Sequence, residues 1–67
     1  MTDMVTNRVD KLRSKADMTQ ADLAKAVGVT RQTIIAIEKG NYTPSVLLAL
    51  IISIFFKKSV EDIFSIC

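Results

Sequence analysis

The chain has 67 residues, one cysteine, no histidine and a formal net charge of +2. A domain this short buries only about 60% of the surface that its unfolded chain exposes, so its stability margin is small. An intramolecular disulfide is excluded, and a zinc site would lack its usual cysteine and histidine ligands. With 49% hydrophobic residues the chain is too apolar for a disordered protein, and its weak positive charge permits a nucleic-acid partner without indicating one.

Helical signals recur along residues 5–66, which we expect to form a single domain. In the first segment, apolar side chains recur with the spacing of one helix face: Val5, Val9, Leu12 and Ala16. Strand signals are absent, because the sequence has no sustained alternation of apolar and polar residues and no Asn-Gly or Asp-Gly hairpin. The sequence therefore predicts an all-α fold.

The second helix, Gln20–Val27, has complete start and stop signals. Thr19 is placed to cap it, and Asp22 lies at its third position as an acidic variant of the capping box. Gly28 follows its last residue, where a residue free to adopt positive φ commonly ends a helix. A short helix that stops at a tight turn is therefore expected here.

A third helix, Arg31–Lys39, follows at once, with Thr30 as its cap and Gly40 at its end. Two short helices joined by a tight turn match the helix-turn-helix unit. With Gln20 as the first position of a twenty-residue window, the five positions that must be apolar hold Leu23, Val27, Val29, Ile34 and Ile37. Ala24 falls where only a small residue lets the two helices approach. This spacing favours a DNA-binding unit over an ordinary helical hairpin.

Two more helices complete the prediction. Pro44 suits the first turn of a fourth helix, which runs to about Phe56. Ser59 and Asp62 repeat the pattern of a cap followed by an acid, which predicts a short fifth helix at about Val60–Phe64. The expected architecture is five short helices with local connections.

Four segments carry a resemblance to a known family: Met18–Ala24, Gly28–Ile34, Ile37–Ser45 and Glu61–Phe64. They are similar to the phage-repressor or Cro-like helix-turn-helix proteins, also called XRE-type regulators, and the resemblance extends over about residues 5–64. It implies a compact, lambda-repressor-like domain of five helices, with the helix-turn-helix at helices two and three. It also implies binding to operator DNA as a dimer, without a cofactor.

The third helix is the expected recognition helix, whose N-terminal part enters the major groove. The side chains assigned to base reading are those that do not face the core: Arg31, Gln32, Thr33, Ile35 and Ala36. The resemblance places base reading on Arg31, Gln32 and Ala36. Gln32 can pair with adenine and Arg31 with guanine or a phosphate, while Ile35 and Ala36 can contact thymine methyl groups. The plainer alternative for Arg31 and Gln32 is a solvated helix start.

A second set of residues is expected to contact the DNA backbone: Gln20, Thr30, Lys39, Asn41 and Tyr42. Gln20 lies at a helix N-terminus, where free N–H groups and the helix dipole favour a phosphate. The resemblance implies that Gln20 also braces the recognition helix, and that the loop with Lys39, Asn41 and Tyr42 touches the backbone. An equally good interpretation of Tyr42 is a ring half-buried under that loop.

Arg13 and Glu38 stand where the family often pairs an arginine of the first helix with an acid of the recognition helix. The resemblance therefore implies a structural ion pair, and neither residue is expected to contact DNA. An acid that faced the phosphates would repel them, which supports an inward orientation of Glu38.

The fourth helix departs from the family, whose outer positions are usually polar. A helix that is apolar all round is enclosed or meets a partner, and a chain this short cannot enclose it. We therefore expect a homodimer through the fourth and fifth helices. The expected interface consists of Leu47, Ile51, Ile54, Phe55, Phe64 and Ile66, with Cys67 as a candidate neighbour. The alternative is that part of this stripe extends the core under the C-terminal tail.

Together these features predict a cytoplasmic, homodimeric transcriptional regulator that binds double-stranded operator DNA. Repression is the default, because a chain without a ligand domain usually acts by occluding a promoter. A two-fold dimer would reach half-sites about 34 Å apart. No small-molecule ligand, cofactor or metal is expected.

Three other functional classes fit the sequence less well. An enzyme is not expected, because the sequence has no histidine, no glycine-rich phosphate loop and no paired carboxylates. The main alternative is a protein-interaction or antitoxin-like module whose apolar helix, residues 46–56, docks on a partner protein. A membrane-surface helix would need basic residues along its polar face, and this segment has none.

Overall fold

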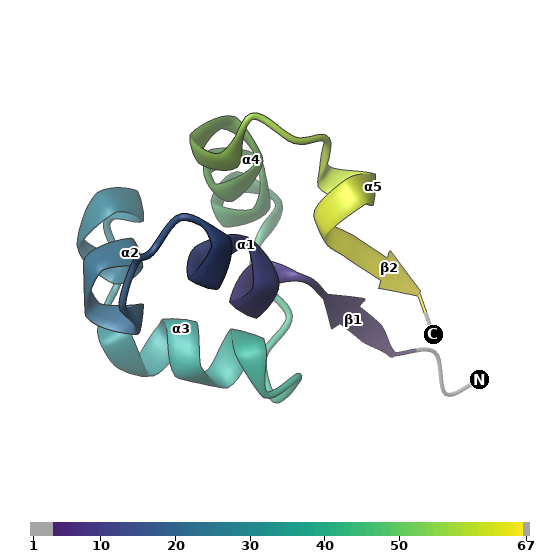
Figure 1. Ribbon diagram of the computed structural model, residues 1–67. Coiled ribbons are helices and arrows are strands. Elements are labelled where there is room, and N and C mark those ends of the chain that lie inside the picture. Colours follow the sequence, from purple (N-terminus) through teal and green to yellow (C-terminus); the bar gives the residue numbers. More distant parts are fainter. Residues whose placement is uncertain (1–3, 67) are drawn as a thin grey trace.

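The computed structural model describes residues 4–66, and in that range the chain forms five helices and one small sheet (Figure 1). In chain order the elements are β1 (Val5–Asn7), α1 (Val9–Lys15), α2 (Gln20–Val27), α3 (Arg31–Glu38), α4 (Val46–Phe56), α5 (Val60–Ile63) and β2 (Phe64–Ile66). The predicted helical class is confirmed. Cys67, considered above as a neighbour of the dimer interface, lies outside the described residues.

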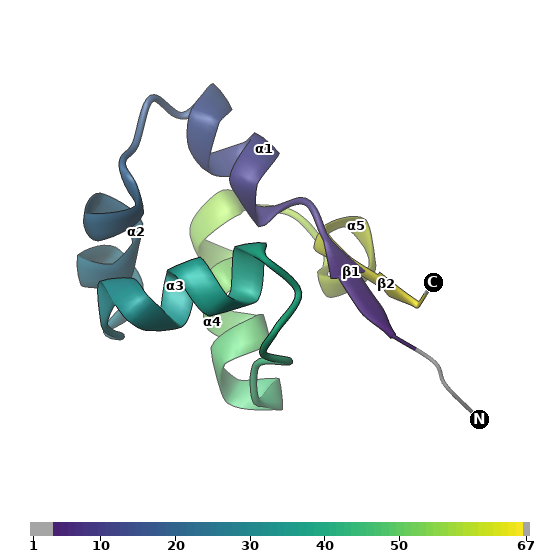
Figure 2. The ribbon, with the colours of Figure 1, turned by 90° about the horizontal axis from the view of Figure 1, so that it is seen from below.

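The expectation that the chain has no strand was wrong, because its two ends pair with each other. Strands β1 and β2 are antiparallel and lie side by side at one end of the molecule (Figures 1 and 2). Their register is Val5 opposite Ile66, Thr6 opposite Ser65 and Asn7 opposite Phe64. Each strand has only three residues. That length is too short for an alternating pattern, and partners so far apart in sequence leave no hairpin-turn signal.

The first helix is shorter than its periodicity suggested. Val5 belongs to β1, and α1 begins at Val9, which is fully buried. Ala16, expected on the buried face, is exposed and stands as the C-cap. Pairing with the C-terminal strand gives the backbone around Val5 hydrogen-bond partners that a frayed helix start would lack.

The signals at α2 are confirmed in detail. The Thr19 hydroxyl accepts a hydrogen bond from the Asp22 backbone N–H, and the Asp22 carboxylate accepts one from the Thr19 N–H, both at 3.0 Å. The pKa of Asp22 lies below its ordinary value. The hydrogen bond from the Thr19 backbone N–H is the largest cause, and the contact with the Thr19 hydroxyl is the second. Gly28 ends the helix with a φ of +81°, a conformation that side chains disfavour.

Three helix ends differ slightly from the predicted bounds. Helix α3 ends at Glu38, one residue earlier than expected. Helix α4 begins after Pro44 rather than at it, because Ser45 caps its first turn through the backbone N–H of Leu48. Helix α5 stops at Ile63, since Phe64 turns into β2.

The core draws on every helix. Its fully buried side chains are Val9, Leu23, Ile34, Ile37, Ile52 and Ile63. Of the five apolar positions of the helix-turn-helix unit, four are buried and Val29 packs half-buried against the same cluster. This packing fixes α3 against α2 and leaves the opposite side of α3 facing outward.

Candidate nucleic-acid interface

Helix α3 lies along one side of the molecule and follows α2 through a tight turn (Figures 1 and 2). Its inner face is anchored by Ile34 and Ile37, both fully buried. On its outer side Arg31 and Gln32 are exposed, while three smaller or apolar side chains are half-buried: Thr33, Ile35 and Ala36. The five residues assigned to base reading therefore all retain accessible surface, with the two long polar side chains at the helix start.

The first turn of α3 is fixed by its own cap. The Thr30 hydroxyl accepts a hydrogen bond from the Thr33 backbone N–H at 3.2 Å, and the two hydroxyl oxygens lie 3.0 Å apart. Thr30 is exposed. A capped first turn presents Arg31 and Gln32 from a rigid backbone instead of a frayed one.

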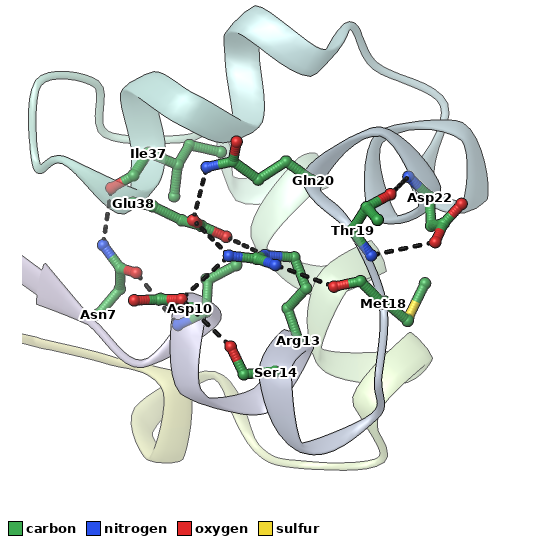
Figure 3. Close-up of polar contacts among 11 residues, drawn as sticks. Asn7, Asp10, Arg13, Ser14, Met18, Thr19, Gln20, Asp22, Ile37 and Glu38 are labelled. Carbon is green, nitrogen blue, oxygen red and sulfur yellow. Dashed lines mark hydrogen bonds and ion pairs between the residues drawn. The ribbon is translucent and has the colours of Figure 1, made fainter.

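The other end of α3 is held by a partly buried ion pair, which Figure 3 shows. Arg13 donates from Nε to Glu38 Oε2 at 2.8 Å and from a terminal nitrogen to Glu38 Oε1 at 3.2 Å. The Glu38 side chain is only 8% exposed and that of Arg13 15%. A bidentate pair of this kind combines charge with fixed geometry. The ion pair that the family resemblance implied is thus present.

Arg13 has further partners that extend the network beyond Glu38 (Figure 3). Its guanidinium also donates to the Met18 carbonyl oxygen at 2.9 Å and to the exposed Asp10 carboxylate at 3.0 Å. Its hydrogen bond to Glu38 is the main cause that raises the pKa of Arg13 above its ordinary value. The guanidinium therefore connects α1, the segment before α2 and the end of α3.

Gln20, the first residue of α2, belongs to the same network. Its Nε2 donates to Glu38 Oε1 at 3.0 Å, and the side chain is half-buried. This contact is the brace between α2 and α3 that the resemblance implied. A phosphate contact by Gln20 remains a prediction. Gln20 is the first residue of α2, where backbone N–H groups at the helix N-terminus can bind a phosphate.

The loop after α3 presents the remaining candidates. Lys39 and Asn41 are exposed, and Gly40 between them has a φ of +79°. The Gly40 and Asn41 backbone N–H groups donate to the carbonyls of Ile37 and Ala36, both at 2.9 Å. These bonds wrap the loop tightly around the end of α3.

Tyr42 is 45% exposed and faces a shallow hollow. The hollow is also lined by Thr33 of α3 and by Leu47 and Ile51 of α4. Tyr42 therefore keeps accessible surface while it lines the hollow, so this position permits both packing and an outward contact by its hydroxyl.

The predicted interface on α4 divides into an exposed part and a packed part. Leu47 and Ile54 are 69% and 74% exposed, and Ile66 of β2 is 73% exposed. Phe55 is also exposed, as are two apolar residues that the prediction did not assign to the interface, Val46 and Leu50. By contrast, Ile51 and Phe64 are half-buried and pack against the core. The alternative that part of the apolar surface extends the core therefore holds for Ile51 and Phe64. The other apolar residues named here stay exposed.

One residue that contacts the end of α3, Asn7 of β1, was not predicted from the sequence. The Asn7 side-chain nitrogen, on β1, donates to the Ile37 carbonyl oxygen at 2.8 Å (Figure 3). No local pattern predicts this contact, because it depends on where the terminal strands lie.

Between residues 4 and 66, no helix combines the length and apolar character needed to cross a membrane.

A capped, outward-facing α3 joined to α2 by a glycine turn defines a helix-turn-helix DNA-binding domain. Comparison with known families agrees: the Helix-turn-helix family (HTH_3) matches residues 9–63. The chain belongs to this family, of the XRE type.

Relatives in distant organisms carry the same domain. The chain is 55% identical over 58 residues to an uncharacterized HTH-type transcriptional regulator of Methanocaldococcus jannaschii, which covers 87% of this chain and 88% of the relative. It is 52% identical over 58 residues to the uncharacterized HTH-type transcriptional regulator YgzD of Bacillus subtilis, with the same shares covered.

Solved structures show the same architecture. The transcriptional regulator VanUg superposes with a TM-score of 0.82 at 28% identity, over 100% of this chain and 89% of that one. The SOS-response transcriptional repressor LexA of Eubacterium rectale superposes with a TM-score of 0.78 at 25% identity, over 82% of this chain. The match spans 58% of that LexA chain.

The Arg13–Glu38 pair is expected to be a major source of stability. Glu38→Ala should lower the free energy of unfolding by about 2–4 kcal/mol, because it leaves the guanidinium of a side chain only 15% exposed without its main partner. Asp10→Ala is the matched control, since it removes an exposed partner of the same guanidinium, and should cost less than about 1 kcal/mol. Urea denaturation at one protein concentration measures both. Equal losses would show that burial of the Glu38 carboxylate is unimportant.

Proposed function

We propose that this protein is a homodimeric transcriptional regulator, acting as a repressor, that reads double-stranded DNA through the major groove with α3. The observation that carries the proposal is the presentation of α3: its inner face is fixed by Ile34 and Ile37, and its outer side displays Arg31 and Gln32. In helix-turn-helix proteins the N-terminal part of this helix contacts base edges. The relatives named HTH-type transcriptional regulators support the regulatory role.

The charges around α3 support a polyanionic partner. Arg31 and Lys39 are exposed at its two ends, and Glu38, the only acid in the helix, turns inward to Arg13. The surface proposed to face DNA therefore has cations without an opposing carboxylate from α3. Contacts of Lys39, Asn41 and Tyr42 with phosphates would set the position of the domain, while Arg31 and Gln32 would select the sequence.

Repression is the simplest regulatory consequence of such binding. A domain that covers an operator excludes other proteins from it by occupying the same DNA. One structural neighbour is named a transcriptional repressor, which agrees with this mode.

The proposed base contacts are tested by substitution and salt. Against a duplex selected from a random library, Arg31→Ala and Gln32→Ala should each weaken binding by about 1–3 kcal/mol and relax the preference at one base position. Lys39→Ala should weaken all duplexes alike and flatten the salt dependence. Lys58→Ala is the matched control, because this exposed lysine lies in the α4–α5 connection, away from α3 (Figure 1). Fluorescence anisotropy gives the affinities.

Selective binding that survives both α3 substitutions would contradict α3 as the reading element. Wild-type protein that prefers no duplex over another would contradict sequence-specific binding altogether.

The exposed stripe supports the homodimer. On α4 it consists of Val46, Leu47, Leu50, Ile54 and Phe55, and all five side chains are exposed in the single chain. Apolar side chains that adjoin on one helix face mark an interaction surface in a small protein. A second copy is the favoured occupant, since a two-fold dimer carries two recognition helices to half-sites about 34 Å apart. The same stripe is also what a docking site for another protein would need, which is the alternative function.

Ile54→Lys distinguishes these possibilities. It places a charge within the stripe, so the dimer should dissociate and the apparent affinity for a two-half-site duplex should fall by at least about tenfold. Ala26→Lys, at an exposed position of α2 outside the stripe, is the matched control and should stay dimeric. Sedimentation velocity measures the assembly state. A wild-type chain that sediments as a monomer at micromolar concentration would favour the protein-docking alternative.

A further inference from the structure

Asn7 is the last residue of β1, and its side chain makes two hydrogen bonds to other elements. Its Nδ2 donates to the Ile37 carbonyl oxygen in the last turn of α3, at 2.8 Å. Its Oδ1 accepts from the Val9 backbone N–H in the first turn of α1, at 3.1 Å. The side chain is half-buried. One amide group thus ties the terminal strand pair to both α1 and α3 (Figure 3).

The carbonyl that Asn7 contacts also takes part in the turn that follows α3. The Ile37 carbonyl also accepts the N–H of Gly40, and the Ala36 carbonyl accepts that of Asn41. These two bonds form the turn from which Lys39, Asn41 and Tyr42 project. The last carbonyls of a helix have no partner within the helix, so an added donor there constrains the direction of the following chain.

On the other side, Asn7 is held by the strand pair. It lies opposite Phe64 in the register, and Phe64 packs against the core. The neighbouring Arg8 N–H donates to the Ile63 carbonyl at 2.8 Å, and the Arg8 guanidinium donates to the Asp62 carbonyl at 3.0 Å. The position of the Asn7 amide therefore depends on the chain's C-terminal segment.

We infer that Asn7 is a positioning residue, which couples the paired chain ends to the C-terminal end of α3 and to the loop proposed to contact the DNA backbone. The effect of Asn7 on DNA binding rests on the proposed function, whereas its effect on α3 rests on the hydrogen bonds alone. When the strand pair is formed, the Asn7 amide holds the Ile37 carbonyl and the turn behind it. When the pair opens or shifts, this turn loses a constraint, although no residue of the strands need touch DNA.

The same coupling connects the two proposed interfaces. Ile66 is exposed at the end of β2, opposite Val5, and belongs to the proposed dimer interface. A second copy packed on Ile66 would hold β2, and through the strand pair it would hold Asn7 and the end of α3. Dimerisation then favours DNA binding by ordering the turn as well as by joining two half-sites.

Amide hydrogen exchange and DNA titration on the 67-residue chain test this inference. Asn7→Ala should raise the exchange rates of the Gly40 and Asn41 amides by about 3- to 10-fold and weaken DNA binding by a similar factor. Asn7→Asp keeps an acceptor for the Val9 N–H but cannot donate to Ile37 when ionised, so it should show the same rise in exchange. Thr6→Ala is the matched control, because the Thr6 hydroxyl donates to the Ser65 carbonyl across the strands, at 3.4 Å, and among residues 4–66 it has no hydrogen bond to α1 or α3.

The readout separates positioning from general stability. The Ile52 amide, in the core of α4, should exchange at the wild-type rate in every variant. A rise at Ile52 equal to that at Gly40 would overturn the inference, as would equal effects of Asn7→Ala and Thr6→Ala. If wild-type protein prefers no duplex, the proposed function fails, and exchange at Gly40 and Asn41 still decides whether Asn7 constrains α3.

Discussion

The bidentate contact between Arg13 and Glu38 is the interaction on which the presentation of α3 depends. It joins α1 to the last residue of α3, and Gln20 of α2 shares the same carboxylate. A helix of eight residues has little stability of its own in water, so its position must come from its neighbours. Packing of Ile34 and Ile37 fixes which face turns outward, and the polar network fixes the far end.

This network also solves an electrostatic problem. An acid at the end of a DNA-reading helix would repel phosphates if it faced them. Because Glu38 is paired and only 8% exposed, its charge is compensated within the domain. Lys39, the next residue, is exposed and can contact an anion. The same arrangement thus stabilises the fold and clears the outer surface of α3 of negative charge.

Features encoded by neighbouring residues could be predicted from the sequence. The Thr19–Asp22 capping box, the Thr30 cap and the turn at Gly28 depend on residues within one helical turn of each other, and all three were expected. The apolar positions of the helix-turn-helix followed from their spacing. The Arg13–Glu38 pair spans 25 positions, and only the family resemblance indicated it.

Features that depend on distant parts of the chain were missed. The strand pair joins residues 5–7 to residues 64–66, and strands of three residues carry no pattern. The helical periodicity that began at Val5 therefore placed the start of the first helix too early. The hydrogen bond from Asn7 to α3 could not be predicted for the same reason, since it depends on the pairing of the terminal strands. The division of the α4 stripe into packed and exposed residues likewise required the fold.

The outer side of α3 and the loop that follows it form the surface that we propose to contact DNA. The most direct measurement is a map of amide chemical-shift changes in the isotope-labelled protein as a selected duplex is added. If this surface contacts DNA, the largest changes should fall at residues 30–36 and 39–42, with small ones along residues 46–56. Changes concentrated on the α4 stripe, with α3 unaffected, would show that the protein does not bind DNA through α3.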